Sequence, residues 1–271
     1  MDKLIITIAP TGNVPTKELN PTTPVTPAEI VADLKACEAM GAAIAHIHVR
    51  DEAQQPTCDR SIFSEVLDMM EKEKVSLIRQ VSTGARGGGN TAEWRSQMLD
   101  LNVEMASLST GSSNFPNGIN ANPPELIEHL IQKMNAHDVK PEIEAFDVAM
   151  IDNAKYLMRK GILKAPLHFN LVMNVPGSIA GTPKNLMHMI ESLPKGATFS
   201  VRGVGRSQVQ MLALSIVMGG HVRTGLEDVL VMPDQTPASN RLLMQQVLNI
   251  AKAVGREIAT PHEARQMLGL A

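Results

Sequence analysis

The stretch Ala42-Ala43-Ile44-Ala45-His46-Ile47-His48-Val49-Arg50-Asp51 decides the fold class, because an apolar run passes directly into polar side chains. Its four apolar residues predict a buried strand. Strand side chains alternate between two faces, so His46, His48 and Arg50 point one way and the residues between them the other. The strand therefore ends in side chains that can do chemistry, immediately before a polar loop.

Similar apolar runs alternate with amphipathic, helix-like runs along the whole chain. The predicted strands cover residues 3–9, 42–49, 76–82, 103–109, 141–146, 167–172, 197–202 and 219–224. The predicted helices cover residues 27–40, 60–74, 91–99, 123–137, 147–160, 182–192, 207–218 and 238–254, with a short extra helix at 261–271. This alternation, with no break in composition, predicts a single TIM barrel, (β/α)₈, over residues 1–271. A doubly wound open sheet is the alternative, and the number of units favours the barrel.

Start and stop signals support these helices. Thr26-Pro27-Ala28-Glu29 places Thr at the N-cap, Pro at the first helical position and Glu two residues later, which is a capping box. Thr182-Pro183 repeats the Thr-Pro start, and Gly41 and Gly161 fall where helices should stop.

Composition excludes several function classes. The net charge of −3 provides no basic face for nucleic acid, and no apolar stretch approaches the roughly 18 residues of a membrane span. The chain begins directly in a predicted strand, so we expect no signal peptide. Cys37 and Cys58 make no disulfide framework, and we expect a cytoplasmic protein.

The two histidines predict a metal site. Their Cα atoms should lie about 6.5–7 Å apart, close enough for both imidazoles to bind one ion, and zinc is the usual choice for redox-silent chemistry. Two satisfied core histidines are the alternative interpretation. A catalytic zinc needs a third protein ligand, and the last strand of a barrel lies close to the second. Glu227 and Asp228 are therefore the favoured acids, with Glu144 and His168 as rivals.

Every predicted strand ends in polar residues, where a barrel carries its active site. After strand seven, Arg202-Gly203-Val204-Gly205-Arg206 is a candidate phosphate site, because glycine allows close backbone approach and arginine adds charged hydrogen bonds. The glycine run 87–89 is equally typical of a lid and of a plain turn. The long loop 10–26 after strand one is of a length that is usually functional.

Taken together, the motifs resemble the β-keto acid cleavage enzyme family over essentially the whole chain. The most specific pair is HxHxRD at residues 46–51 followed by RTGLED at 223–228. The other matching stretches are Ile8-Ala9-Pro10-Thr11-Gly12, Asn20-Pro21, Val25-Thr26-Pro27-Ala28-Glu29-Ile30, Gln80-Val81-Ser82-Thr83-Gly84, Met105-Ala106-Ser107-Leu108, Gly111-Ser112, Glu144-Ala145-Phe146-Asp147 and Gly203-Val204-Gly205-Arg206.

The resemblance implies a zinc-dependent barrel, usually a homotetramer, that converts a β-keto acid and acetyl-CoA into acetoacetate and a new CoA thioester. It implies that His46, His48 and Glu227 bind zinc, that Asp228 is the general base, and that Arg223 lies beside it. Deprotonation between the two carbonyls gives an enolate, which attacks the thioester before a retro-Claisen step.

Substrate contacts follow from the same resemblance. Ser82 should hold the substrate carboxylate, and Ser109 is preferred over Thr110 as the strand-four hydroxyl. The expected substrate contacts are Asn13, Ser82, Thr83, Gly84, Ser109 and Thr110. The expected contacts to the CoA phosphates are Arg202, Gly203, Gly205 and Arg206.

One position departs from the family pattern. The member that acts on an aminated substrate carries a glutamate shortly after the first glycine, where Gly12-Asn13-Val14-Pro15 here has Val14. A buried ammonium against valine would lack a partner. We therefore expect a β-keto acid that has no cationic group near Val14.

Two further functions compete with this interpretation. A metal-dependent hydrolase of amidohydrolase type also uses HxH in a barrel, but it normally carries HxH on strand one and adds histidines after strands five and six. Strand five here offers Glu144 instead. A non-catalytic barrel that binds a metal or a small molecule is the third possibility. Turnover with acetyl-CoA separates the three.

Overall fold

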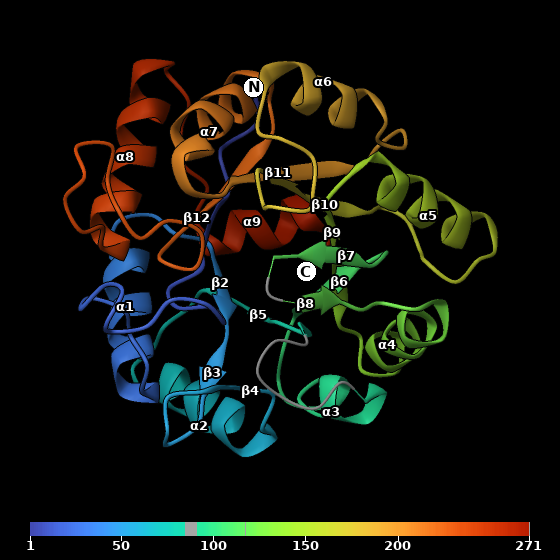
Figure 1. Ribbon diagram of the computed structural model, residues 1–271, viewed down its shortest axis with the longest axis horizontal. Helices are drawn as coiled ribbons and strands as arrows, with labels where there is room; N and C mark the ends of the chain where they lie inside the picture. The colour runs from blue at the N-terminus through green and yellow to red at the C-terminus, as the bar shows by residue number, and fades with distance from the viewer. Residues whose placement is uncertain (85–90, 117, 271) are drawn as a thin grey trace.

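The computed structural model describes residues 1–84, 91–116 and 118–270, and within them eight parallel strands close into a barrel (Figure 1). The strand order around the barrel is β1-β12-β11-β10-β9-β6-β5-β2. Their bounds are β1 Ile6–Ile8, β2 Ile44–Ile47, β5 Ile78–Val81, β6 Met105–Ser109, β9 Lys140–Ala145, β10 His168–Met173, β11 Thr198–Gly203 and β12 His221–Thr224. The predicted barrel is confirmed. An open sheet is excluded because β1 pairs with both β2 and β12.

Helices surround the barrel on all sides in Figure 1. They are α1 Pro27–Ala39, α2 Arg60–Lys72, α3 Ala92–Ser96, α4 Pro124–Ala136, α5 Val148–Arg159, α6 Pro183–Glu191, α7 Gln208–Val217, α8 Asn240–Ala253 and α9 Pro261–Leu268. Each overlaps a predicted helix. In the described part of the chain, no helix combines the length and the apolar character needed to cross a membrane.

The predicted helix signals are present in the structure. The Thr26 side chain accepts from the Glu29 backbone N–H while the Glu29 carboxylate accepts from the Thr26 N–H, which completes the capping box of α1. The Thr182 hydroxyl oxygen caps α6 by accepting from the Asn185 backbone N–H. Gly41 and Gly161 follow α1 and α5 with φ of +108° and +73°, a conformation that glycine adopts without a Cβ clash.

Two hairpins and a 3₁₀ turn lie outside the eight predicted units. They are β3 Val49–Arg50 with β4 Pro56–Thr57, β7 Ser113–Phe115 with β8 Gly118–Asn120, and η1 Gly205–Ser207. Strands of two or three residues are too short to show a period-two pattern, which explains why the sequence did not reveal them. Strand β2 also ends at Ile47, so His48 lies between β2 and β3 rather than within a continuous strand.

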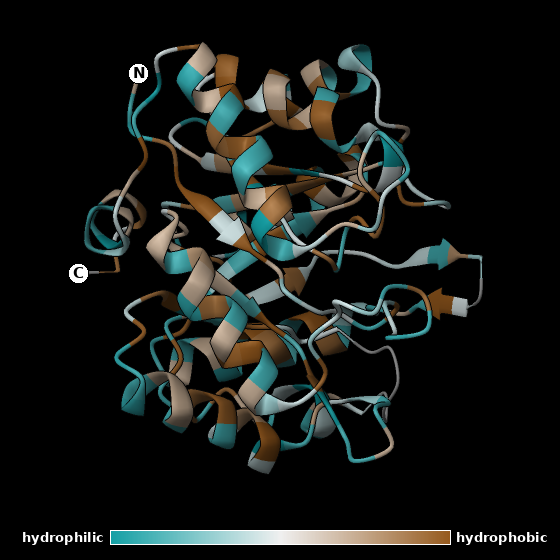
Figure 2. Ribbon diagram, turned by 90° about the vertical axis from the view of Figure 1, so that its left-hand side faces the viewer, coloured by the Kyte–Doolittle hydropathy of each residue, from teal (hydrophilic) through white to brown (hydrophobic). Residues whose placement is uncertain are grey.

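The two ends of the barrel differ. Helix α9 lies across the amino-terminal end, and the β7–β8 hairpin projects from the opposite end (Figure 2). The apolar residues that pack against one another at the α9 end include Ile5, Ile44, Ile78, Met105, Ala264 and Leu268. The described strands carry polar side chains above this layer, and those that are almost completely buried include Thr7, His46, Gln80, Glu142, His168, Asn170 and Arg223. The closed end therefore supplies an apolar floor, and the interior above it is polar.

Candidate metal centre at the carboxyl end of the barrel

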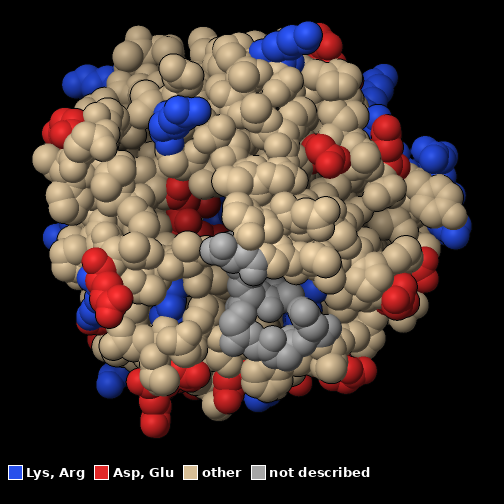
Figure 3. Space-filling model, viewed as in Figure 1, with Lys and Arg blue, Asp and Glu red and all other residues tan. Residues whose placement is uncertain are grey.

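Charged side chains gather in a recess at the open end of the barrel. Figure 3 shows acidic atoms and a few basic ones at the bottom of this recess, while the surrounding surface is mostly uncharged. The described side chains that converge there come from β2 and the residue after it, from β9, β11 and β12, and from the segment after β12. They are His46, His48, Glu144, Arg202, Arg223, Glu227 and Asp228. Buried charges need partners, so their arrangement indicates what the site binds.

The two imidazoles face each other through their Nε2 atoms, which lie 3.2 Å apart. The Nδ1 atom of His46 lies 2.6 Å from the amide oxygen of Gln80, and the Nδ1 atom of His48 lies 2.9 Å from that of Asn13. An amide oxygen only accepts, so each Nδ1 carries the proton and donates it. With Nδ1 protonated, the neutral form of each ring presents an unprotonated Nε2 to the other.

Glu227 completes the group. Its Oε2 atom lies 3.3 Å from His48 Nε2 and 3.6 Å from His46 Nε2. This oxygen is buried, and no described side chain or backbone group donates a hydrogen bond to it. Two nitrogens held about 2.0–2.1 Å from a tetrahedral zinc would themselves lie roughly 3.3–3.4 Å apart. The three residues therefore fit a metal ion, and they form the one such group found among the described residues.

The protonation of His46 agrees with a ligand role. Burial lowers the pKa of His46 to about 3, and the nearby Arg223 guanidinium contributes to the fall. The ring is therefore neutral at physiological pH, as metal binding requires. With both rings in their neutral form, the two Nε2 lone pairs and a Glu227 oxygen are directed at one point, where a cation would hold them together.

The buried charges around this point do not balance. The carboxylates are Glu142, Glu144, Glu227 and Asp228, and the guanidiniums are Arg202 and Arg223. There are two more carboxylates than guanidiniums in this described cluster. Burial raises the pKa of Glu144 and of Asp228, and a divalent cation in their midst would favour the ionised carboxylates.

Arg223 is the centre of this network. Its guanidinium is fully buried and lies 3.0 Å (Nε) and 3.2 Å (Nη2) from the two carboxylate oxygens of Asp228, 2.5 Å from Glu227 and 3.4 Å from Glu144. Burial alone would lower the pKa of Arg223, but these carboxylates raise it. The side chain is therefore a permanent cation that fixes the acids around it.

The pKa values of the adjacent acids Glu227 and Asp228 are shifted in opposite directions. Burial would raise the pKa of Glu227, but Arg223 and the two imidazoles hold it well below its usual range. Burial raises the pKa of Asp228, and Arg223 and Arg202 only partly offset the rise. Glu227 is thus suited to bind a cation as a carboxylate, while Asp228 is the more basic of the pair. Neighbouring acids separated in this way are typical of an acid–base site.

The rival ligands lie away from the three converging atoms. Glu144 faces the arginines, with its Oε1 atom 3.4 Å from Arg223 Nη1 and 3.7 Å from Arg202 Nη1. His168 lies deeper, with Nδ1 2.9 Å from the Thr198 hydroxyl and Nε2 3.6 Å from Glu142. Neither contributes to the metal-binding group, so the expectation that favoured an acid after strand eight over these two agrees with the geometry.

The hydroxyls after strands three and four divide into two classes. Thr83 Oγ1 donates to the Ser107 carbonyl at 2.7 Å, and Thr110 Oγ1 donates to the Met150 carbonyl at 2.7 Å. Both threonines are buried, and their hydroxyl protons are used to hold strands and loops together. Ser82 accepts the Gly84 N–H at 3.2 Å, which leaves its own O–H free to donate. Ser109 lies at the mouth end of β6 and is the better of the two strand-four candidates.

Of the four residues predicted to bind phosphate after β11, two are buried and two are exposed. Arg202 is buried, and its Nη1 atom lies 3.3 Å from Glu227 and 3.4 Å from Asp228, so its charge is already engaged by the site. Gly203 has no room for a Cβ, because the Gln208 backbone would lie 2.7 Å away, and its role is close packing. Gly205 and Arg206 are exposed, and they are the part of this prediction that remains available to a phosphate.

Two positioning contacts were missed from the sequence. From the sequence, Gln80 had no role beyond its place in a strand. Its register with His46 in the β2–β5 pair places its amide against that ring. Arg50 was expected to share the face of the histidines, but its Nη2 atom donates to the backbone oxygens of Gly12 (2.7 Å) and Pro15 (2.5 Å). The end of β2 at Ile47 breaks the alternation, which explains the difference.

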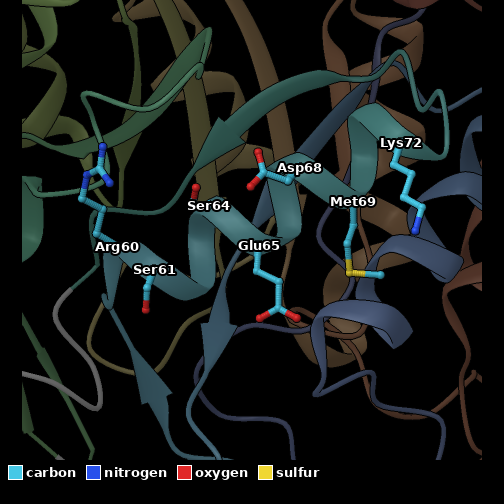
Figure 4. A pocket seen from close by; sticks show the side chains of 7 residues that line it. All are labelled: Arg60, Ser61, Ser64, Glu65, Asp68, Met69 and Lys72. Atoms are coloured by element: carbon cyan, nitrogen blue, oxygen red, sulfur yellow. The ribbon is translucent and has the colours of Figure 1, made fainter.

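Other features give no competing centre. The glycine run 87–89 lies outside the described residues. The hollow in Figure 4 is on α2, on the outside of the barrel, and is lined by Arg60, Ser61, Ser64, Glu65, Asp68, Met69 and Lys72. Its charges are of both signs and mostly exposed, as on an ordinary solvated helix. Cys37 and Cys58 are free and buried, and burial raises the pKa of their thiols to about 12 and about 11.

Known proteins resemble this chain from end to end. The profile of the beta-keto acid cleavage enzyme family matches residues 3–270. The 3-keto-5-aminohexanoate cleavage enzyme of Acetoanaerobium sticklandii is 42% identical over 272 residues, which cover 100% of this chain and 99% of that protein. The 3-oxoadipate:acetyl-CoA acetyltransferase of Cupriavidus necator is 40% identical over 270 residues, which cover 98% of this chain and 94% of that protein.

A solved structure supports the fold. Apo ObcA superposes with a TM-score of 0.81 at 22% identity, over 92% of this chain and 66% of that longer chain. At this identity the likeness concerns the barrel alone. The family match over residues 3–270, together with relatives about 40% identical along their whole length, shows that this chain belongs to the β-keto acid cleavage enzyme family.

Proposed function

We propose that this chain is a zinc-dependent β-keto acid cleavage enzyme that acts as a single catalytic domain over residues 1–271. It would convert a β-keto acid and acetyl-CoA into acetoacetate and a new acyl-CoA. The observation that carries the proposal is the convergence of three possible ligand atoms, from His46, His48 and Glu227, beside the buried Arg223–Asp228 pair. Zinc bound there would supply a Lewis acid for the keto group.

The chain's own residues account for the proton transfer. Asp228, with its raised pKa, would take the proton from the carbon between the two carbonyl groups, so that the C–H bond breaks and its electron pair stays on carbon. Arg223 and Arg202 hold the Asp228 carboxylate in place and offset the negative charge that develops. Ser82 has a free O–H for the substrate carboxylate, and Ser109 is our proposal for a second hydroxyl contact.

The remaining steps balance without another reactant. The carbanion attacks the thioester carbonyl of acetyl-CoA and forms a C–C bond as the CoA thiolate leaves. The thiolate then attacks the original keto carbon, and the bond between that carbon and its neighbour breaks. Asp228 returns its proton to the released carbon, which gives acetoacetate and a new thioester. The chain needs only to hold both substrates in one water-poor recess.

The test is a panel of β-keto acids, each incubated with acetyl-CoA and the purified protein. Mass spectrometry of the products should reveal free acetoacetate together with the acyl-CoA that matches the keto acid supplied. Keto-acid loss without any new CoA ester would instead favour a hydrolase of amidohydrolase type. Tight zinc binding with no turnover across the panel would favour a binding protein.

The resemblance also supports a homotetramer. Ile119 on β8, in the projecting hairpin, is 67% exposed in the single chain, and burial in an assembly would remove this apolar side chain from water. Light scattering on the purified protein measures the number of chains.

We expect Arg206→Ala to weaken acetyl-CoA binding selectively. Arg206 is exposed and follows Gly205, whose φ of +61° belongs to the left-handed region, at the mouth of the barrel. One exposed charged contact to a phosphate is worth about threefold to tenfold in the apparent KM for acetyl-CoA. Steady-state kinetics with each substrate varied should show this rise and an unchanged KM for the keto acid. Arg159→Ala on α5 serves as the control, and an unchanged acetyl-CoA constant would remove Arg206 from the site.

We expect the preferred keto acid to lack a cationic group near Val14. The Val14 side chain is 53% exposed, so an ammonium beside it would stay partly hydrated, and the large penalty expected for a buried charge does not apply. Val14→Glu should shift the ratio of kcat/KM toward 3-keto-5-aminohexanoate by up to about fivefold, as for an exposed ion pair. Val14→Gln is the uncharged control. If the unmodified protein already prefers the amino substrate over a neutral one of similar length, another acid such as Glu18 must reach it.

A further inference from the structure

Asn13 lies on the loop after β1 and contacts a proposed metal ligand. Its side-chain oxygen lies 2.9 Å from His48 Nδ1. The opposite amide orientation would place an N–H₂ group there, so His48 Nδ1 would have to be an acceptor and Nε2 would carry the proton. That proton would point at His46 Nε2, only 3.2 Å away, and at Glu227. Only the first orientation leaves both Nε2 atoms able to bind a cation.

In the same orientation the Asn13 amide nitrogen lies close to Gly84, as Ser82 does. A Cβ added to Gly84 would lie 3.7 Å from Asn13 Nδ2 and 3.2 Å from Ser82 Oγ. The amide donor and the serine hydroxyl therefore border the same small space. Asn13 is partly exposed, in contrast to the fully buried Gln80 that performs the equivalent contact for His46. A molecule that enters the recess can therefore reach Asn13.

Hydrogen bonds from Arg50 fix the loop that carries Asn13. Arg50, which is 4% exposed, donates to the backbone oxygens of Gly12 and Pro15, on either side of Asn13. A Cβ on Gly12 would lie 2.4 Å from Glu227 Cγ, so the loop also packs directly on the third ligand. The position of the Asn13 amide is thus fixed by the backbone and does not depend on a flexible side chain alone.

We propose that Asn13 links zinc binding to recognition of the substrate carboxylate, an inference that rests on the proposed function. Its oxygen holds His48 in the tautomer that binds zinc, and its N–H₂ group donates, beside the Ser82 hydroxyl, to the carboxylate of the β-keto acid. Asn13 is therefore a positioning residue for His48 and a binding residue for the substrate.

Three variants of the full-length protein separate these roles. Asn13→Ala loses both groups, and it should raise the zinc Kd about 10- to 100-fold, the usual effect of losing the hydrogen-bond partner of a metal ligand. Asn13→Asp keeps an acceptor for His48 but replaces the donor with a negative charge. It should bind zinc within a few-fold of the unmodified protein while the KM for the keto acid rises about tenfold or more. Asn114→Ala, at an exposed asparagine in β7, should change neither quantity.

Zinc Kd is measured by competition with a chromophoric chelator, and the visible spectrum of the Co²⁺-loaded protein reports ligand geometry independently of activity. Unchanged zinc affinity and an unchanged cobalt spectrum in Asn13→Ala would overturn the positioning role. An unchanged keto-acid KM in Asn13→Asp would overturn the substrate role. If the unmodified protein itself binds no zinc, the proposed function fails, which is distinct from either result.

Discussion

Asp228→Asn should retain zinc and a folded barrel but lose about 10²- to 10⁴-fold of its turnover, the usual contribution of a general base. The substitution keeps the shape of the side chain. An amide oxygen can still accept from Arg223 Nε, which lies 3.0 Å from Oδ2. A neutral amide is far less basic than a carboxylate, so it cannot take a proton from carbon. The three metal-binding residues remain, so zinc content should not change.

The measurement combines kcat, zinc content and the melting temperature. Asp152→Asn is the matched control, because Asp152 is an exposed acid of α5 whose partner, Lys155, lies 3.2 Å away. Turnover near that of the unmodified protein would show that Asp228 is a structural partner of Arg223 and that the base lies elsewhere. A simultaneous loss of zinc and of the folded state would instead indicate that the charge of Asp228 is needed to neutralise the arginines.

The barrel was predictable because its information is local. Several strands contain short apolar runs, such as Leu171–Met173 in β10, and several helices begin with a side chain that caps them, as Thr26 does for α1. The candidate metal group was predictable for a topological reason. Strand β1 lies between β2 and β12, so residues after the last strand face His46 and His48 across one strand only. The sequence alone left Glu227 and Asp228 as equal candidates. In the structure Glu227 faces the two histidines and Asp228 pairs with Arg223, which separates them.

Directions of single side chains were harder to predict. Arg202 was assigned to a phosphate because it stands beside two glycines, but it lies within β11 and turns into the barrel toward the buried acids. Arg202 lies two residues after Ser200 in β11, so both side chains are on the same, inward face of the strand, and this spacing could have indicated the direction. The contact of Asn13 with His48 depends on the path of a loop, and that path is set by Arg50, 37 residues further along the chain. No local pattern encodes such a contact.

The double variant His46→Ala/His48→Ala should abolish zinc binding, with the content falling from one ion per chain to near zero. Two of three ligands are lost, and Glu227 alone, already 2.5 Å from Arg223, would pair with that guanidinium instead. The buried excess of carboxylates then has no cation to balance it. We expect no turnover with any keto acid, since the proposed chemistry needs the metal.

Stability supplies a second measurement for the same variant. An ion that binds only the folded chain, present at 100 times its Kd, stabilises it by about 2.7 kcal/mol, or roughly 5–10 °C in Tm for a chain of this size. A chelator should therefore lower the Tm of the unmodified protein by that amount and leave the double variant unchanged. His137→Ala/His188→Ala, at two exposed histidines, should behave as the unmodified protein. Full zinc occupancy in His46→Ala/His48→Ala by elemental analysis would place the ion elsewhere in the chain and remove the basis of the proposed mechanism.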